Sequence, residues 1–244
     1  SSAGTGYCGS GNECIKGTLV YDYGEAAPDI IADTYFNLEI DGVGSPAGAL
    51  DINGDLTINS GKSLDMGSYA LNVAGDITNS GTLDLTGNTT TLDGSSTQTV
   101  TGAISAKNLT ISNTGTVTTG AVTINSGGTL TIGTGTLDVG GAFDATSAAV
   151  TFTGSGRLQL ASTVTSLGTF TESTGTVEYD GAAQTVDSDT YYNLEIDGSG
   201  TKTIAGDITV SNDLTLSAGT LELGGSDRKS TRLNSSHDQI SYAV

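Results

Sequence analysis

The chain offers one pair of carboxylates at a spacing suited to catalysis. Asp187 and Asp189 are separated by a single residue. On a β-strand, residues i and i+2 face the same way about 6.6 Å apart, a separation that fits the acid and the base of a glycoside hydrolase. Only Arg157 could supply a guanidinium to a uronate substrate, which counts against this chemistry. A polysaccharide hydrolase or lyase built on a β-helix is nevertheless one hypothesis for this chain.

A solvated acidic surface is the simpler interpretation of the same pair. A chain this rich in acidic residues brings carboxylates together incidentally, and no loop is long enough to build cleft walls around Asp187 and Asp189. We therefore expect a non-catalytic protein without catalytic residues, and we keep the carbohydrate-active enzyme as an alternative.

The segment DINGD, which contains Asp51, Asn53 and Asp55, is partly similar to a calcium-binding loop. It lacks the D-x-D-x-D-G order and the distal glutamate of an EF-hand, and the tandem GGxGxD repeat is also absent. We assign no metal ligand and no cofactor, and calcium binding at acidic turns stays open.

The last residues of the chain, 227–244, differ in kind from the rest of the sequence. Residues 227–237 read DRKSTRLNSSH, which is the conceptual translation of a common short-read sequencing adapter, and DQISYAV continues it. We expect residues 227–244 to be a non-native tail and exclude them from fold reasoning. We also expect the chain to be a fragment of a longer protein.

Without this tail the body contains no histidine, because His237 is the only one in the chain. It therefore has no histidine-based triad and no imidazole metal ligand. Removing the tail's three basic and two acidic residues from the 8 and 27 of the whole chain leaves a net charge of −20. Such a body repels nucleic acid and anionic lipid. No apolar run approaches the ~20 residues of a membrane span, so we expect neither nucleic-acid binding nor membrane insertion.

Both cysteines, Cys8 and Cys14, lie in the Gly/Ser-rich lead formed by residues 1–16. Two close cysteines in a polar segment favour a local disulfide in an oxidising compartment. A redox pair or half of a metal site is less favoured, because the spacing is not CxxC and no second ligand pair exists.

The body, residues 17–226, is dominated by pairs of apolar residues with one polar residue between them. This alternation places both apolar residues on one face of a short strand. The pairs are Leu38/Ile40, Leu56/Ile58, Leu64/Met66, Leu71/Val73, Leu83/Leu85, Leu109/Ile111, Leu130/Ile132, Leu137/Val139, Leu158/Leu160, Leu194/Ile196, Leu214/Leu216 and Leu221/Leu223.

The spacing of these pairs indicates a coil. Strands are expected to start at Leu56, Leu64, Leu71, Ile77 and Leu83, and three such strands make a coil of about twenty residues. We predict an all-β chain folded as a right-handed parallel β-helix (a β-solenoid) with about three short strands per coil. A β-sandwich is the main rival, but its strands are longer and return at wider spacing.

Thr-x-Thr pairs recur along the body. Rows of outward threonines on a flat solenoid face would be similar to those of ice-binding proteins, so an ice- or mineral-binding solenoid is a further alternative. We expect instead that the pairs frame different strands and alternate with Asp and Glu, because threonine is simply a good strand residue. The pairs are Thr89/Thr91, Thr99/Thr101, Thr116/Thr118, Thr129/Thr131, Thr151/Thr153, Thr163/Thr165 and Thr201/Thr203.

Asn37, Asn108 and Asn193 each precede an L-x-I pair. Stacked amides at such positions form ladders along a turn, so we assign these asparagines a structural role. Adjacent aromatic residues such as Tyr191 and Tyr192 point to opposite faces of a strand, and we expect one of each pair to pack inward rather than to form a sugar platform.

Internal repetition supports a solenoid. The segment NLEIDG occurs at residues 37–42 and 193–198, and a weaker copy at 88–113 keeps the triplet QTV and the segment NLTI. The units FNLEIDG and YYNLEIDGSGTKTIAGDITVSNDLTLSAGTLELGG resemble repeats of large bacterial surface proteins of the adhesin or hemagglutinin-like β-helix type.

This resemblance implies a non-catalytic structural or adhesive stretch of a larger protein, located outside the cell or on its surface. It implies extracellular glycan or protein partners and carries over no binding residue. Because open solenoid ends expose unpaired strand edges, we also expect self-association through the ends.

Overall fold

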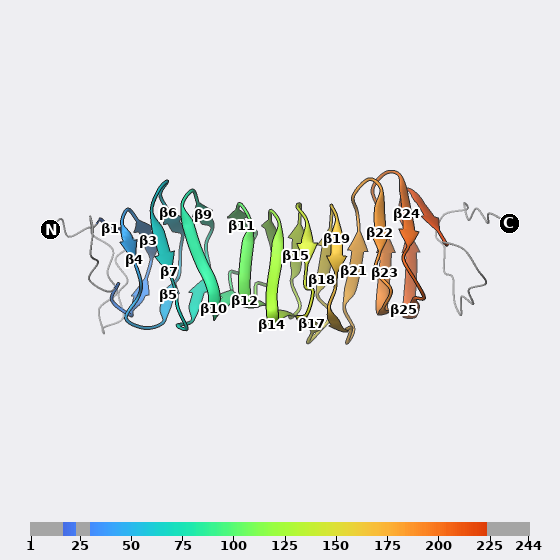
Figure 1. Cartoon of the computed structure of the whole chain (residues 1–244), viewed down its shortest axis with the longest axis horizontal. Coiled ribbons are helices and arrows are strands. Elements are labelled where there is room, and N and C mark those ends of the chain that lie inside the picture. The colour runs from blue at the N-terminus through green and yellow to red at the C-terminus, as the bar shows by residue number, and fades with distance from the viewer. Residues whose placement is uncertain (1–16, 23–29, 224–244) are drawn as a thin grey trace.

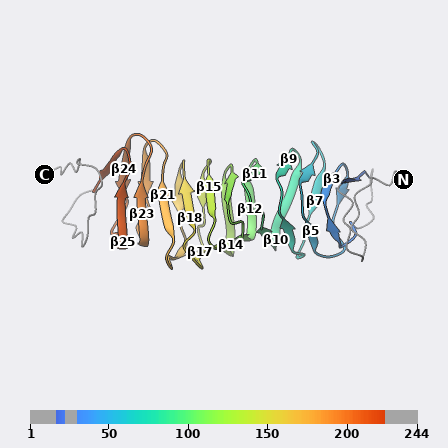
Figure 2. The same ribbon diagram turned by 180° about the vertical axis from the view of Figure 1, so that it is seen from behind.

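The computed structural model describes residues 17–22 and 30–223, and these form a straight rod with its first and last described strands at opposite ends (Figure 1). Its strands run across the long axis, and the same arrangement is seen from behind (Figure 2). The fold is all-β, a β-solenoid of about 10 turns with about three strands per coil, as predicted. Among the described residues no helix is long and apolar enough to cross a membrane. The expected disulfide of Cys8 and Cys14, and the tail of residues 227–244, lie outside the described ranges.

Within residues 17–22 and 30–223 every strand pair is parallel, and the strands form three sheets along the rod. The first sheet contains β1 (Thr18–Tyr21), β3 (Asn37–Ile40), β6 (Leu56–Ile58), β9 (Ile77–Asn79), β11 (Gln98–Thr101), β13 (Thr116–Thr119), β15 (Thr136–Val139), β18 (Arg157–Leu160), β21 (Thr176–Tyr179), β23 (Thr190–Ile196) and β25 (Thr209–Leu216). The second sheet contains β2 (Thr34–Tyr35), β5 (Leu50–Ile52), β8 (Leu71–Val73), β10 (Thr82–Leu92), β12 (Ile104–Ile111), β14 (Val122–Ile132), β16 (Phe143–Asp144) and β19 (Val164–Ser166), with β4 (Val43–Gly44), β7 (Ser63–Asp65), β17 (Ala149–Phe152) and β20 (Thr169–Thr171) as branches. The third sheet contains β22 (Gln184–Val186), β24 (Thr201–Ile204) and β26 (Thr220–Glu222).

The core is a narrow spine of apolar side chains stacked coil upon coil. Leu137, Leu158, Val177 and Leu194 are successive register partners in the first sheet, and all are at most 1% exposed. Each such side chain contributes about 1.5–3 kcal/mol when it leaves water. The predicted L-x-L pairs therefore form the interior. The pairs of the last described coil are less buried, and Leu223 is 47% exposed.

The predicted coil length is confirmed by the register. Leu109 pairs with Leu130, and Leu137 pairs with Leu158. The strands β10, β12 and β14 are longer than predicted and contain register irregularities. In β14 the irregularity needs glycine: Gly127 has a φ of 69°, and a Cβ on Gly128 would lie 1.8 Å from the backbone oxygen of Lys107.

The strong repeats form the same unit at the two ends of the rod. Thr18 pairs with Asn37 between β1 and β3, and Thr176 pairs with Asn193 between β21 and β23. The weak copy lies on a different side of the coil: its Asn108 is in the second sheet, whereas Asn37 and Asn193 are in the first. The repeat therefore specifies a local corner and not a side of the solenoid.

The three asparagines have a structural role, but they do not stack on one another. Each donates from Nδ2 to a threonine of the preceding coil and accepts at Oδ1 from the following one. Asn37 bonds to Thr18 at 3.4 Å and accepts from the backbone N of Asp55 at 2.8 Å. The row continues with aspartates, since Asp55 accepts from Asp76 N at 2.9 Å and Asp76 from Thr99 N at 2.7 Å. Aspartate oxygens thus extend the predicted ladder.

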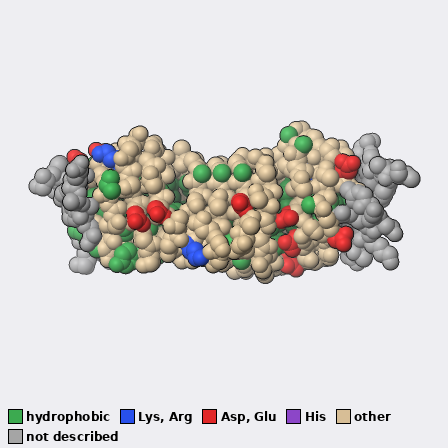
Figure 3. Space-filling model, viewed as in Figure 1, with side chains coloured by type: hydrophobic (Ala, Val, Ile, Leu, Met, Phe, Trp, Pro, Cys, Tyr) green, Lys and Arg blue, Asp and Glu red, His purple; other side chains and the backbone are tan. Residues whose placement is uncertain are grey.

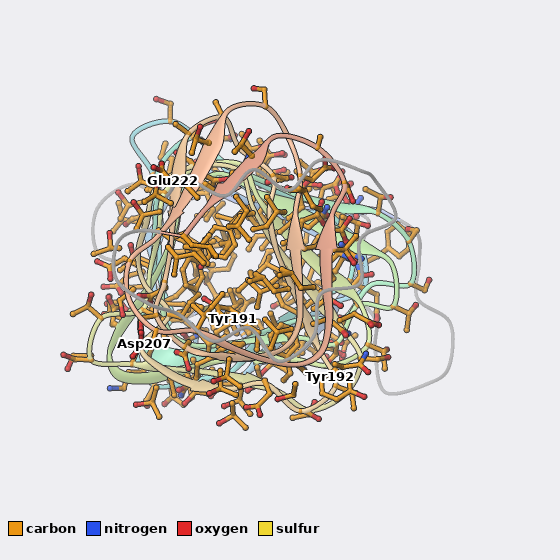
Figure 4. All side chains as sticks on the ribbon, turned by 90° about the vertical axis from the view of Figure 1, so that its right-hand side faces the viewer. Tyr191, Tyr192, Asp207 and Glu222 are labelled. Carbon is orange, nitrogen blue, oxygen red and sulfur yellow. The ribbon has the colours of Figure 1, made fainter. Side chains whose placement is uncertain are left out.

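The adjacent aromatic residues divide between the two sides of the strand, as expected. Tyr191 is fully buried, whereas Tyr192 is half-buried at the periphery (Figure 4). Inside, the hydroxyls of Tyr191 and Tyr179 are 3.3 Å apart, and the Tyr191 hydroxyl donates to the backbone oxygen of Asp187 at 2.7 Å. Burial raises the pKa of Tyr179 to about 12.

Candidate binding face

The outer side of the second sheet carries two parallel columns of threonine across five coils. The first column follows the register Thr89, Asn108, Thr129, Ala149 and Thr169, and the second follows Thr91, Thr110, Thr131, Thr151 and Thr171. We call these ten residues the threonine face. Eight of the ten are threonine, and none is charged.

The hydroxyls of this face are available to a ligand. Thr89, Thr169 and Thr171 are exposed, and the other members are half-buried by their neighbours. Within the described ranges, no protein group bonds to the hydroxyl of any threonine in the second column. In the first column, the Thr89 hydroxyl accepts from Asn108 Nδ2 at 3.3 Å. Each unpaired hydroxyl therefore keeps one donor and two acceptor sites for water or a partner.

The interior fixes the positions of the two columns. The residues that alternate with them stack in register: Thr90, Leu109, Leu130 and Val150 are buried, and Phe170 is half-buried. Because one strand residue faces inward and the next outward, a regular interior column produces a regular exterior column. Threonine is also stiff at χ1, so its hydroxyl and methyl have defined directions.

Beyond Thr91 the second column continues through Asn72 to the charged Asp51, and a longer row of charged residues lies on the first sheet. On the outer side of the first sheet, successive register partners are Thr118, Asp138, Gln159, Glu178 and Glu195. The expectation that Thr-x-Thr pairs alternate with Asp and Glu therefore does not hold for the ten positions of the threonine face, whereas Asp51 interrupts the same column two coils before Thr91. In Figure 3 the acidic side chains on the visible face are scattered among neutral ones.

The charged group of the first sheet is built around Arg157, whose partners sequence reasoning missed. Its Nη1 lies 2.5 Å from Glu178 Oε2 and 2.7 Å from Glu195 Oε2. Burial raises the pKa of Glu178 despite the hydrogen bonds from Arg157 and Gln159. Burial would also raise the pKa of Glu195, but hydrogen bonds from Arg157 and Ser217 outweigh it, and the pKa falls. The guanidinium is thus engaged by two carboxylates of adjacent coils.

The carboxylate pair of the alternative enzyme hypothesis lies at a corner rather than on a strand. Asp187 and Asp189 occupy the segment between β22 and β23, so the i, i+2 geometry of a strand does not apply. Asp187 accepts from Leu167 N at 2.8 Å and Ser188 N at 3.0 Å, and Asp189 accepts from Thr190 N at 2.8 Å. Burial and the charges of Asp187 and Glu172 raise the pKa of Asp189. Both carboxylates hold backbone N–H groups of the corner.

The segment DINGD is also part of the framework. Asp51 accepts from the Thr34 hydroxyl at 3.4 Å, and Asp55 belongs to the ladder described above. In the described residues no group of three or more His, Cys, Asp or Glu side chains is placed to hold a metal ion.

A buried lysine is a further feature that the sequence pattern did not reveal. Lys202 is fully buried, and its Nζ donates to the backbone oxygens of Gly181 at 2.5 Å, Ser199 at 3.1 Å and Asp197. Burial lowers its pKa, and the charges of Asp180 and Asp197 oppose that shift. Three carbonyls match the three donors of an ammonium group, so Lys202 fastens a corner of two coils.

A groove of about 400 Å³ opens on the third sheet near the C-terminal end of the rod. It is lined by Thr163, Val164, Ala183, Gln184, Thr185, Thr201, Thr203 and Glu222, the last of which is labelled in Figure 4. Its lining contains one carboxylate, that of Glu222, and neither Asp187 nor Asp189.

Comparison of the chain with protein-family models gave no match, and comparisons with curated proteins and with solved structures gave none either.

Proposed function

We propose that this chain is a non-catalytic structural and adhesive β-solenoid, one stretch of a larger protein at the cell surface or outside the cell, and that it makes contact through the threonine face. The observation that carries the proposal is the in-register pair of columns running across five coils. An array with a constant repeat suits an extended partner, whereas a small ligand needs a concave site.

Charge supports the same choice of partner. The body carries a net charge of −20 once the tail of residues 227–244 is set aside. The threonine face itself is neutral, so it presents hydroxyls and methyls without the repulsion that an acidic surface exerts on anionic partners. A neutral, hydroxyl-bearing surface such as a glycan or a polymer fits it better than nucleic acid or anionic lipid.

The enzyme hypothesis receives less support. The carboxylates of Asp187 and Asp189 are already bonded to backbone N–H groups, and Arg157 is occupied by Glu178 and Glu195. A catalytic acid and base must instead reach the substrate. Turnover of neutral or acidic polysaccharides that is abolished by Asp187→Asn would overturn the non-catalytic proposal.

Assembly through the ends extends the proposal. Among the described strands, β1 and β25 form the two edges of the first sheet. Because all pairs are parallel, the edge of one copy continues the sheet of another, which would produce filaments rather than closed rings.

The adhesive role can be tested by retention of the full chain on washed bacterial cells, chitin and cellulose. Placing lysines on the threonine face, as Thr110→Lys with Thr131→Lys, should abolish retention. The matched control, Thr57→Lys with Thr78→Lys on the outer side of the first sheet, should leave it unchanged. Equal retention of both variants would refute the assignment of the contact surface.

A further inference from the structure

We propose that the ligand of the threonine face is ice, bound through water molecules that the face holds in a lattice-like order. This inference rests on the proposed function, because it names the partner of the same face. Its basis is the two-dimensional regularity of the ten positions.

The geometry of a parallel sheet gives the face two repeat distances. Partners on adjacent coils are about 4.8 Å apart, and residues i and i+2 of one coil are about 6.6 Å apart. Five coils therefore give a patch of two columns about 19 Å long. The shorter repeat is close to one spacing of water oxygens on the prism planes of hexagonal ice, and the longer repeat is somewhat shorter than the other. A soluble sugar or a peptide presents no such two-dimensional lattice.

The chemistry of the side chains suits water in particular. A threonine hydroxyl both donates and accepts, as a water molecule does, and the neighbouring methyl restricts where the next water can lie. A charged side chain would instead impose its own hydration shell. The ten positions contain neither acid nor base, and the hydroxyls of Thr91, Thr110, Thr131, Thr151 and Thr171 are bonded to no protein group in the described ranges.

The face is also organised before binding. Its threonines are stiff at χ1 and stand on an interior column in which Leu109 and Leu130 are fully buried and Phe170, at one end, is half-buried. Little side-chain entropy is therefore lost when the lattice forms. Two of the ten positions are not threonine. Asn108 is held in place because its Oδ1 accepts from Thr129 N at 3.1 Å. Ala149 presents a methyl group without a hydroxyl.

The experiment measures thermal hysteresis and the partition of the full chain into slowly growing ice. The wild-type chain should shape ice crystals, slow their growth and concentrate in the ice. Thr131→Lys, at the centre of the face, should reduce the partition at least about tenfold, which corresponds to a loss of about 1.4 kcal/mol of binding. The control Thr57→Lys, on the first sheet, should partition like the wild type.

A second variant separates loss of binding from loss of fold. Thr110→Val with Thr131→Val removes two hydroxyls and keeps the methyls and the branched shape, and circular dichroism should show an unchanged fold. A weakened ice response from this variant supports the inference, and an unchanged response contradicts a role for the hydroxyls.

The arms of the test also separate the two proposals. If the wild-type chain ignores ice but is retained on crystalline chitin or cellulose in a way that Thr131→Lys abolishes, the ice inference fails while the threonine face remains the contact surface. If neither ice nor any polymer or cell retains the chain, both proposals fail.

Discussion

Thr110 and Thr131 are register partners on adjacent coils, with their side chains on the same outer side of the second sheet. The chain between them completes one full turn through β13 on the first sheet. Thr110 ends an Asn-x-Thr segment and Thr131 ends a Thr-x-Thr segment, and the coil makes them neighbours in one column.

The threonine face should contribute little to stability. Thr131→Val should change the free energy of unfolding by no more than about 0.5 kcal/mol, because it retains a β-branched strand residue and removes a hydroxyl without a protein partner. The comparison is Leu130→Ala, which truncates a fully buried neighbour and should cost about 3 kcal/mol. Urea denaturation of both variants measures the difference. A large loss in Thr131→Val would mean that the row is structural.

The buried ammonium of Lys202 should be strongly stabilising. Lys202→Met leaves the carbonyls of Gly181, Asp197 and Ser199 without their donor, and the unfolding free energy should fall by about 3 kcal/mol. Lys62 provides a control, because it bonds to the backbone oxygen of Asp41 at 2.7 Å with a side chain that is 34% exposed. Lys62→Met should cost about 1 kcal/mol or less, since water replaces the lost contact. Equal effects of the two variants in chemical denaturation would show that the buried site is not special.

The buried amide of Gln184 should act as a backbone clamp. Its Nε2 donates to Leu160 O at 2.6 Å and Ser162 O at 2.7 Å, and its Oε1 accepts from Gly181 N at 2.8 Å. Gln184→Ala should lower the unfolding free energy by about 2 kcal/mol, because it leaves polar backbone groups of two coils unsatisfied. The adjacent Thr185 is exposed, so Thr185→Ala should be nearly silent. Thermal unfolding followed by circular dichroism compares the two, and a silent Gln184→Ala would contradict the clamp.

The two glutamates that share Arg157 should respond to pH with opposite signs. The pKa of Glu195 is lowered in the folded chain, so its stabilisation is present above its unfolded pKa and is lost as pH falls through the folded value. Glu195→Gln should therefore destabilise the chain at pH 7, by about 1 kcal/mol after solvent screening, and the difference should vanish in acid.

Burial raises the pKa of Glu178, so ionisation of this residue costs stability as pH rises from its unfolded to its folded value. Glu178→Gln should therefore become more stable, relative to the wild type, as pH rises through that window. Urea midpoints at pH 3, 5 and 7 test both glutamates. Parallel pH profiles of the two variants would contradict the assigned shifts.

Much of the fold follows from local pattern. The L-x-L pairs predict the interior residues correctly, from Leu38 and Ile40 to Leu194 and Ile196, because alternation along a strand needs no knowledge of distant residues. The coil length follows from the spacing of the pairs. The inward side of Tyr191 and the structural role of Asn37 follow from the same local rules.

The site could not be predicted in the same way. Coils range from 17 residues, between Tyr179 and Ile196, to 23, between Ile77 and Val100. These differences accumulate along the chain, so a segment's own sequence does not determine the side of the rod on which it falls. The displaced Asn108 shows the consequence, since the same motif that places Asn193 in the first sheet places Asn108 in the second.

The sequence by itself therefore determined that apolar and polar residues alternate along short strands, that these strands form a coil, and which residues line its interior. Only the tertiary structure decided that threonines lie together on the outer side of the second sheet, that Glu178 and Glu195 both bind Arg157, and that Lys202 donates to three backbone carbonyls. The physical reason is that alternation is a property of neighbouring residues, whereas a column is a property of residues one full coil apart, and its alignment depends on every corner in between.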